Sequence, residues 1–194
     1  CYPERKTDKV FDKMNFIIKP NKMTYVIGPS GSGKSTLFDL ILLHYDNYHG
    51  SIMLGDLDIR SINRNIILEN ITLVSQTPTL FNDTIRNNIL ACSNWTNLPS
   101  KLEMECICKF ALLENLIAEL PDGLDTRIGS GGIKLSGGQA QKVALARAFA
   151  RNTSILLLDE PLSAVDMRQR IVLMENIKRW RNGKTTVIIT HDLE

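Results

Sequence analysis

The chain has 194 residues, a length typical of a single domain. Its composition, 43% hydrophobic and 23% charged residues, is that of a folded globular protein and excludes a disordered or fibrous chain. Lys and Arg together number 23 against 21 for Asp and Glu, so the net charge of +2 gives no support for nucleic acid or a membrane surface as a partner.

The apolar segments are too short to cross a membrane. The longest aliphatic runs include 40–43 and 155–158, whereas a transmembrane helix needs about 20 apolar residues. No signal-peptide pattern is present at the N-terminus. The cysteines are interpreted as free thiols in a reducing compartment, because they form no C-x-x-C pair and have no His at ligand spacing; they are Cys1, Cys92, Cys106 and Cys108.

Short β-rich segments and one helix are predicted for the first third of the chain. The strands are expected at 16–18, 25–27 and 71–75, and a hairpin at 51–59 turns at Gly55-Asp56. Residues 34–43 carry apolar side chains at helical spacing.

The middle of the chain has helical patterns instead. They cover 84–90, 101–120 and 139–151, and are separated by Pro99, Pro121 and the glycines between 129 and 138. The apolar runs 155–158 and 186–189 then flank an amphipathic helix at 168–181. Buried strands that alternate with helices predict a parallel sheet covered on both faces, with a helical insertion at about 82–151.

A phosphate-binding loop is predicted at residues 28–35, which read Gly-Pro-Ser-Gly-Ser-Gly-Lys-Ser and match G-x-x-x-x-G-K-[ST] between a strand and a helix. Glycines let backbone N–H groups converge on a phosphate, and the N-terminus of the helix favours an anion. In such a loop Lys34 reaches the β- and γ-phosphates and the Ser35 hydroxyl binds Mg²⁺. The residues assigned to a nucleoside triphosphate are Gly28, Ser30, Gly31, Ser32, Gly33, Lys34, Ser35 and Thr36.

Two carboxylates follow the apolar strand 155–158. Ligands of parallel sheets bind beyond the carboxyl ends of the strands, so Asp159 and Glu160 are expected to face the phosphate loop. Asp159 is placed to hold Mg²⁺ through water, and Glu160 to polarise an attacking water as general base. The alternative is a surface turn with two solvated acids.

A second glycine-rich helix start, Leu135-Ser136-Gly137-Gly138-Gln139, precedes these acids. Alone it would be an ordinary helix entry. Together with the phosphate loop and Asp159-Glu160, it resembles the nucleotide-binding domain of ATP-binding cassette (ABC) transporters, whose hallmark is the LSGGQ sequence. The resemblance implies an α/β fold, the P-loop NTPase fold of ABC ATPases, with a mainly parallel core sheet, an N-terminal antiparallel β segment and a helical subdomain.

The same resemblance implies roles for residues elsewhere in the chain. Tyr2 matches the aromatic that stacks on adenine, Gln76 the glutamine that senses the metal and the attacking water, and His191 the switch histidine at the γ-phosphate. The implied cofactors are ATP and Mg²⁺. Glu160, His191 and Gln76 are the implied catalytic set, and Ser35, Gln76 and Asp159 the implied metal set.

A partner domain is also implied. Two such domains are expected to pack head to tail, with ATP between the phosphate loop of one and Ser136, Gly137, Gly138 and Gln139 of the other. The loop 163–166 matches the segment that communicates across this pair. ATP binding would close the pair, and hydrolysis would loosen it.

Several segments indicate an exporter. Residues 79–86 are of the type that contacts transmembrane helices in exporters, and 120–129 and 180–186 resemble a peptide-pheromone exporter. Most exporters of this class carry Glu-Arg-Gly where this chain has Ser130-Gly131-Gly132, which puts in doubt a coupling role that depends on the acid. Residues 160–166 also resemble the multidrug-resistance-associated subfamily.

We therefore expect one ABC nucleotide-binding domain over residues 1–194, cut at both ends from a membrane exporter and placed at the cytoplasmic face. Its expected partners are transmembrane domains and a second nucleotide-binding domain, and not nucleic acid. The alternatives are a multidrug-resistance-associated exporter or a soluble, non-transport ABC ATPase. A guanine-nucleotide switch is disfavoured because Asn21-Lys22 precedes the phosphate loop and is followed by Thr24 in the position of the Asp.

Overall fold

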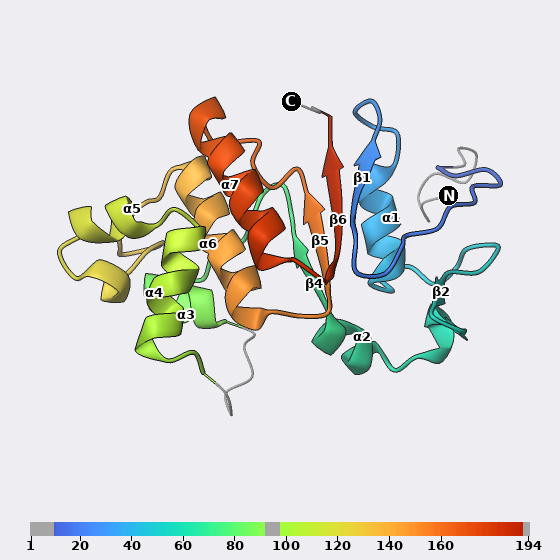
Figure 1. The fold of residues 1–194 in the computed structure, drawn as a ribbon, viewed down its shortest axis with the longest axis horizontal. Helices are drawn as coiled ribbons and strands as arrows, with labels where there is room; N and C mark the ends of the chain where they lie inside the picture. Colours follow the sequence, from blue (N-terminus) through green and yellow to red (C-terminus); the bar gives the residue numbers. More distant parts are fainter. Residues whose placement is uncertain (1–9, 92–97, 192–194) are drawn as a thin grey trace.

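A computed structural model describes residues 10–91 and 98–191 of the chain (Figure 1). Its core is a parallel sheet with the strand order β1-β6-β5-β4. The strands are β1 (Met23–Ile27), β4 (Ile71–Val74), β5 (Ile155–Asp159) and β6 (Thr185–Thr190). The predicted α/β class with a parallel core sheet is confirmed.

Helices cover both faces of the sheet because side chains alternate along each strand. Leu156, Leu158 and Ile188 share one hydrophobic core with α3 (Ile85–Leu90), α4 (Lys101–Phe110), α6 (Gly137–Arg151) and α7 (Met167–Trp180). Leu157, Val187 and Ile189 share the other with α1 (Lys34–Ile41) and α2 (Arg64–Asn70). In Figure 1 the first group of helices lies to the left of the sheet and the second to the right.

The parallel arrangement brings the ends of four strands to one edge of the sheet. Gly28 follows β1, Gln76 comes shortly after β4, Asp159 ends β5 and His191 follows β6. Residues from four distant parts of the sequence are thereby gathered at the carboxyl edge, where open α/β sheets bind their ligands.

Two predicted elements are wrong. Residues 16–18 form no strand, and Ile17 is 87% exposed; a strand requires a partner for its backbone groups, and among the described residues these have no ladder. The predicted helix 101–120 is two helices, because α4 ends at Phe110 and α5 covers Glu114–Glu119. Leu112 between them adopts a left-handed φ of 53°.

The remaining elements agree with the expectation or extend it. The antiparallel segment is confirmed as the hairpin of β2 (Met53–Leu54) and β3 (Leu57–Asp58). Helix α2 was not expected, and two short 3₁₀ turns, η1 (Ile59–Ser61) and η2 (Gly123–Asp125), complete the structure. Within residues 10–91 and 98–191, every helix is too short or too polar to cross a lipid bilayer.

Candidate active site

The phosphate loop joins β1 to α1 and is shaped by glycine. Gly31 and Gly33 have φ of +78° and +90°, a conformation that other residues adopt only at a cost. A Cβ at Gly33 would clash with Cγ1 of Val10, so the segment around Val10 approaches the loop closely at this glycine. The first N–H groups of α1 and the positive end of its dipole therefore face this loop.

Lys34 sits over the loop. Its Nζ donates hydrogen bonds to the carbonyl oxygens of Gly28 and Pro29, at 2.7 and 2.8 Å. Both acceptors are neutral carbonyls, and a phosphate oxygen, which is charged, forms a stronger bond with an ammonium group. The arrangement thus holds a cation where a phosphate can replace the carbonyls as acceptor.

Oxygen ligands for a metal ion lie beside this lysine. Asp159 accepts a hydrogen bond from the Ser35 side chain. Burial, the largest influence, raises the pKa of Asp159 above its usual value, as does Glu160, while Ser35 and Lys34 oppose the rise. A hydroxyl and a carboxylate are the hard ligands that Mg²⁺ prefers, and Mg²⁺ in nucleotide sites takes only one or two carboxylates together with phosphates and waters.

In the part of the chain that the structure describes, no group of three or more His, Cys, Asp or Glu residues could hold a metal ion by itself. The donor set around Ser35 and Asp159 fits Mg²⁺ bound together with a nucleotide.

Two side chains from neighbouring strand ends converge on the carboxylate of Glu160, which follows a third strand. Gln76 Nε2 donates to Glu160 Oε2 at 2.7 Å, and His191 Nδ1 lies 3.2 Å from Glu160 Oε1. The Glu160 backbone N–H donates to the carbonyl of Ile189 at 3.0 Å. Glu160 has a φ of 44°, so its backbone is left-handed and strained. Both carboxylate oxygens are thus oriented by groups outside the turn that carries them.

The LSGGQ segment begins α6 with a capping box. Ser136 Oγ accepts from the Gln139 N–H at 3.2 Å, and Gln139 Oε1 accepts from the Ser136 N–H at 2.8 Å. A Cβ at Gly138 would lie 2.7 Å from the carbonyl oxygen of Ala164, and one at Gly137 would lie 3.2 Å from the Ala164 Cβ. The glycines therefore let α6 pack directly on the loop that follows Glu160.

Tyr2 lies outside the described residues, so its contact with adenine stays a prediction. Ser30 and Ser32 are exposed on the loop, and Thr36 is half-buried in the first turn of α1. The contact of Ser136, Gly137, Gly138 and Gln139 with a nucleotide held by a second domain also stays a prediction.

The comparisons with known proteins agree with this geometry. The family profile described as ABC transporter matches residues 11–163. The chain belongs to the ABC transporter family. The family resemblance of the sequence is thereby confirmed, and with it membership of a family of ATP-binding, ATP-hydrolysing domains.

Relatives of this ABC domain include exporters. The chain is 46% identical over 199 residues to the alpha-factor-transporting ATPase of Saccharomyces cerevisiae, covering 99% of this chain and 15% of that protein. It is 41% identical over 194 residues to the multidrug resistance-like ATP-binding protein MdlA of Escherichia coli, covering 99% of this chain and 32% of that protein. The chain thus spans less than a third of these relatives.

A solved structure shares the fold of this ABC domain. A bacterial Atm1-family ABC exporter with ATP bound superposes with a TM-score of 0.83 at 36% identity. The match covers 89% of this chain and 30% of the exporter chain. The predicted ABC ATPase fold is therefore confirmed.

Two polar residues that the sequence reasoning missed organise the exporter-type segment 79–86. Asn88 is fully buried and accepts from the Phe81 N–H at 2.8 Å. Arg147 of α6 donates from Nε to the Asn88 carbonyl at 2.7 Å and from a terminal nitrogen to that of Thr79 at 3.1 Å. The signal for Arg147 was its place among the apolar side chains of α6, whereas Asn88 follows two other polar residues of α3 and gave no such signal. Their contacts leave Phe81 52% exposed.

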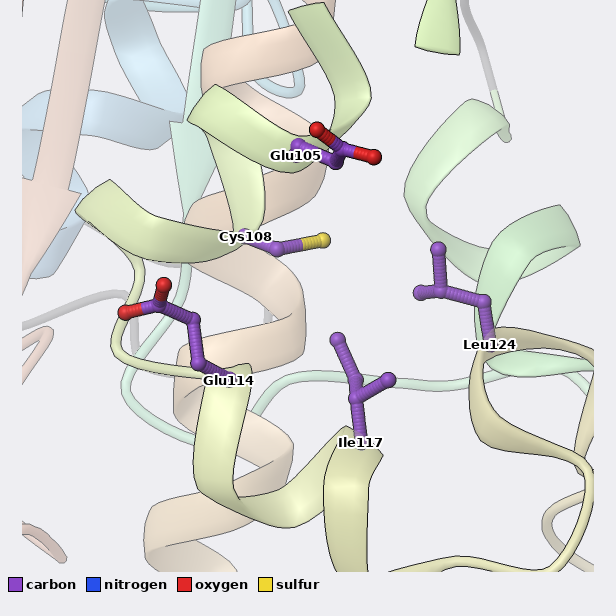
Figure 2. A pocket seen from close by; sticks show the side chains of 5 residues that line it. All are labelled: Glu105, Cys108, Glu114, Ile117 and Leu124. Atoms are coloured by element: carbon purple, nitrogen blue, oxygen red, sulfur yellow. The ribbon is translucent and has the colours of Figure 1, made fainter. Parts of the chain in front are cut away.

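A small cavity of about 170 Å³ lies between α4, α5 and η2. Figure 2 shows the Cys108 sulfur directed into the space between Glu105, Ile117 and Leu124. Burial raises the pKa of Cys108 to about 11, so the thiol is protonated at neutral pH. Cys106 and Cys108 are free, as predicted, whereas Cys1 and Cys92 lie outside the described residues. Cys108 is a packing residue and not part of the site.

Proposed function

We propose that this chain is the motor of an exporter, in which Mg²⁺ and ATP bind at the carboxyl edge of the sheet and hydrolysis drives transport through transmembrane domains. The observation that carries the proposal is the convergence of Gln76, Glu160 and His191 from three strand ends beside the phosphate loop. Hydrolysis requires a base, groups that orient it and a phosphate cradle, and the site offers all three.

Binding is assigned to the loop and α1. The backbone N–H groups of 31–35 and the Lys34 ammonium would hold the β- and γ-phosphates, and Tyr2 would stack on adenine. Ser35, Asp159 and Gln76 would hold Mg²⁺, which neutralises charge on the phosphate oxygens. The hydrogen bond between Ser35 and Asp159 already orients the first two for one ion.

The chemical step is assigned to Glu160. Its carboxylate accepts a proton from water as the water oxygen attacks the γ-phosphorus and ADP leaves. Gln76 fixes one carboxylate oxygen at 2.7 Å and orients the base. His191 holds the other oxygen through Nδ1, and Nε2 is the nitrogen assigned to the γ-phosphate.

The second binding surface is assigned to the start of α6. Because Ser136 Oγ accepts the Gln139 N–H, the hydroxyl proton of Ser136 is available for donation to a phosphate. Gly137, Gly138 and Gln139 complete a helix N-terminus, which favours an anion. We assign this surface to the ATP held by a second nucleotide-binding domain packed head to tail, an arrangement with two composite sites.

The similarity to the relatives supports a proposal for the transport partner and the cargo. Phe81 and the surrounding 79–86 segment are the proposed contact with transmembrane helices, and the cytoplasmic face of a membrane is the proposed location of the chain. A peptide pheromone is the proposed cargo, because the 46% identical yeast relative carries the name alpha-factor-transporting ATPase. A multidrug exporter is the alternative, supported by the 41% identity to MdlA.

Two substitutions test the assignment in the full-length protein that contains this chain. Glu160→Gln keeps the size and shape of the side chain and removes the base, so ATP binding should persist while the steady-state rate falls at least about 100-fold. Lys34→Ala should weaken ATP binding itself. Isothermal titration and phosphate release give the two quantities. Unchanged hydrolysis in Glu160→Gln would remove Glu160 from the catalytic role, and hydrolysis that cargo never stimulates would argue against transport.

A further inference from the structure

A buried glutamine on α6 connects the loops that surround Glu160. Gln141 is 1% exposed. Its Nε2 donates to the backbone carbonyl of Gln76 at 3.0 Å and to Ser163 Oγ at 2.9 Å, and its Oε1 accepts from the Ala164 N–H at 3.0 Å. Both N–H groups and the carbonyl of one carboxamide are therefore used, each by a loop residue far away in the sequence.

Each of these loops carries part of the proposed reaction. Gln76 binds the Glu160 carboxylate through its own side chain. Ser163 and Ala164 lie in the turn that begins at Glu160, and the Ser163 N–H donates to the Glu160 carbonyl at 3.2 Å. The Ala164 carbonyl in turn lies against Gly138 at the start of α6. Gln141 thus joins the orienting residue, the turn that carries the base, and the LSGGQ helix.

A side chain that served only packing would not be built in this way. A carboxamide removed from water costs free energy unless its hydrogen bonds are made, whereas an apolar side chain of the same volume carries no such cost. The surroundings on α6 are apolar, since Val143, Ala144 and Leu145 are all buried. The polar group therefore imposes a geometry on its three partners in addition to filling space.

We propose that Gln141 is a positioning residue for ATP hydrolysis. It sets the distance of Gln76 and of the 163–164 loop from Glu160, and it transmits a displacement of the LSGGQ segment to that centre along the first turns of α6. The base is then correctly oriented only when both loops are seated on α6. This inference rests on the proposed function, because it assumes that Glu160 is the base.

The test is Gln141→Met in the full-length protein, a substitution that keeps the volume and removes all three hydrogen bonds. We expect kcat for ATP hydrolysis to fall at least about tenfold, equal to about 1.4 kcal/mol. KM for ATP and the Kd of a fluorescent ATP analogue should stay within about twofold, because Gln141 contacts neither Lys34 nor the rest of the phosphate loop through these bonds. Loss in kcat at constant KM distinguishes positioning from binding.

Two controls separate positioning from stability. Gln169→Met makes the same change on α7, where the Gln169 side chain accepts a hydrogen bond from Lys142. Its kcat should stay within about twofold of the wild type. Asn176→Leu removes a hydrogen bond of 2.9 Å to the Phe110 carbonyl, away from the loops. It shows how much kcat changes when only stability is lost.

A second variant keeps the proposal falsifiable if Gln141→Met does not fold. Ser163→Ala removes one of the three bonds at an exposed position, and should lower kcat by a smaller factor. Its melting temperature should fall only slightly, because one N–H of the buried Gln141 carboxamide loses its acceptor. If Gln141→Met does not fold, a kcat of Ser163→Ala equal to that of the wild type overturns the inference. If it folds, the double variant should lose no more than Gln141→Met alone, because both changes remove the same interaction.

Three results would overturn the inference. The first is that Gln141→Met loses no more kcat than Asn176→Leu at equal melting temperature. The second is that Gln141→Met raises KM and leaves kcat unchanged. The third is that the effects of Gln141→Met and Ser163→Ala on kcat are fully additive. The failure of the proposed function looks different. In that case the wild type itself would hydrolyse no ATP, or Glu160→Gln would hydrolyse it normally.

Discussion

Two adjacent glycines of α6 allow a sharp comparison. Gly137 and Gly138 occupy the first turn of the same helix, so replacing either by Ala changes the intrinsic helix propensity in the same direction, by up to about 1 kcal/mol. Their surroundings differ. The new Cβ at 138 would lie 2.7 Å from the Ala164 carbonyl oxygen, whereas the Cβ at 137 would meet only the Ala164 methyl group, at 3.2 Å.

The magnitude follows from these distances. Non-bonded heavy atoms prefer a separation of about 3.5 Å or more, so the 138 contact is too close by roughly 0.8 Å and involves backbone that is itself hydrogen-bonded to Gln141. Overpacking of this kind costs about 1–3 kcal/mol. At about 2 kcal/mol, a chain of this size loses about 4–8 °C in its melting temperature.

The expected outcome is therefore a pair of unequal melting temperatures. Gly137→Ala should melt within a few degrees of the wild type, and Gly138→Ala clearly below it, with a reduced rate of ATP hydrolysis because the 163–165 loop is displaced. Thermal unfolding followed by circular dichroism measures the first quantity, and phosphate release the second. Equal melting temperatures for the two variants would refute the close approach of α6 to Ala164.

Two further predictions concern charges removed from water. Asp159→Asn should raise the melting temperature of the nucleotide-free protein at neutral pH. Burial raises the pKa of Asp159, so the folded state holds the proton more tightly than the unfolded state and loses stability as the pH rises through that pKa. The gain in melting temperature should vanish in acid below the usual Asp pKa, and a gain that persists there would contradict this cause. Arg181→Met should lower the melting temperature by about 6–12 °C without changing ATP affinity. Arg181 is 3% exposed and donates hydrogen bonds to the carbonyls of Thr153, Ser154 and Thr185, and each of these bonds is worth about 1 kcal/mol. A denaturation curve that matches the wild type would contradict this prediction.

The sequence was sufficient for the parts of the site that local chemistry defines. The aliphatic run 155–158 can only be a buried segment, and the acids after it must fall at the end of a strand. The glycines of the phosphate loop and the lysine that follows define a turn into a helix in the same way. The positions of Gln76 and His191 followed from the family resemblance, and the parallel sheet brings both to Glu160.

Non-local packing decided the parts that the sequence did not predict. No Gly or Pro lies between Lys101 and Leu120, yet the helix ends before Ala111. Ala111 and Leu113 are both fully buried, and the chain changes direction between them through the left-handed backbone of Leu112. The β-rich residues 16–18 have the propensity of a strand, but pairing depends on a neighbour and not on propensity alone.

The contacts of Gln141 are a second example of structure that the sequence alone does not predict. A polar side chain stands there in the apolar stripe that Leu145 and Ala148 continue at helical spacing, and this was a usable signal of a buried polar role. Its partners, however, are 65 and 22 residues away in the chain. Only the folded structure identifies them as the loops on either side of Glu160.

The left-handed backbone of Glu160 has a consequence for engineering. A β-carbon at a φ of 44° costs about 1–2 kcal/mol, which glycine would avoid. A search for thermostable variants that scores folding alone will therefore favour Gly at position 160 and discard the proposed base together with the strain. If Glu160 is that base, stability and turnover are opposed at this residue, so any such library should hold position 160 constant.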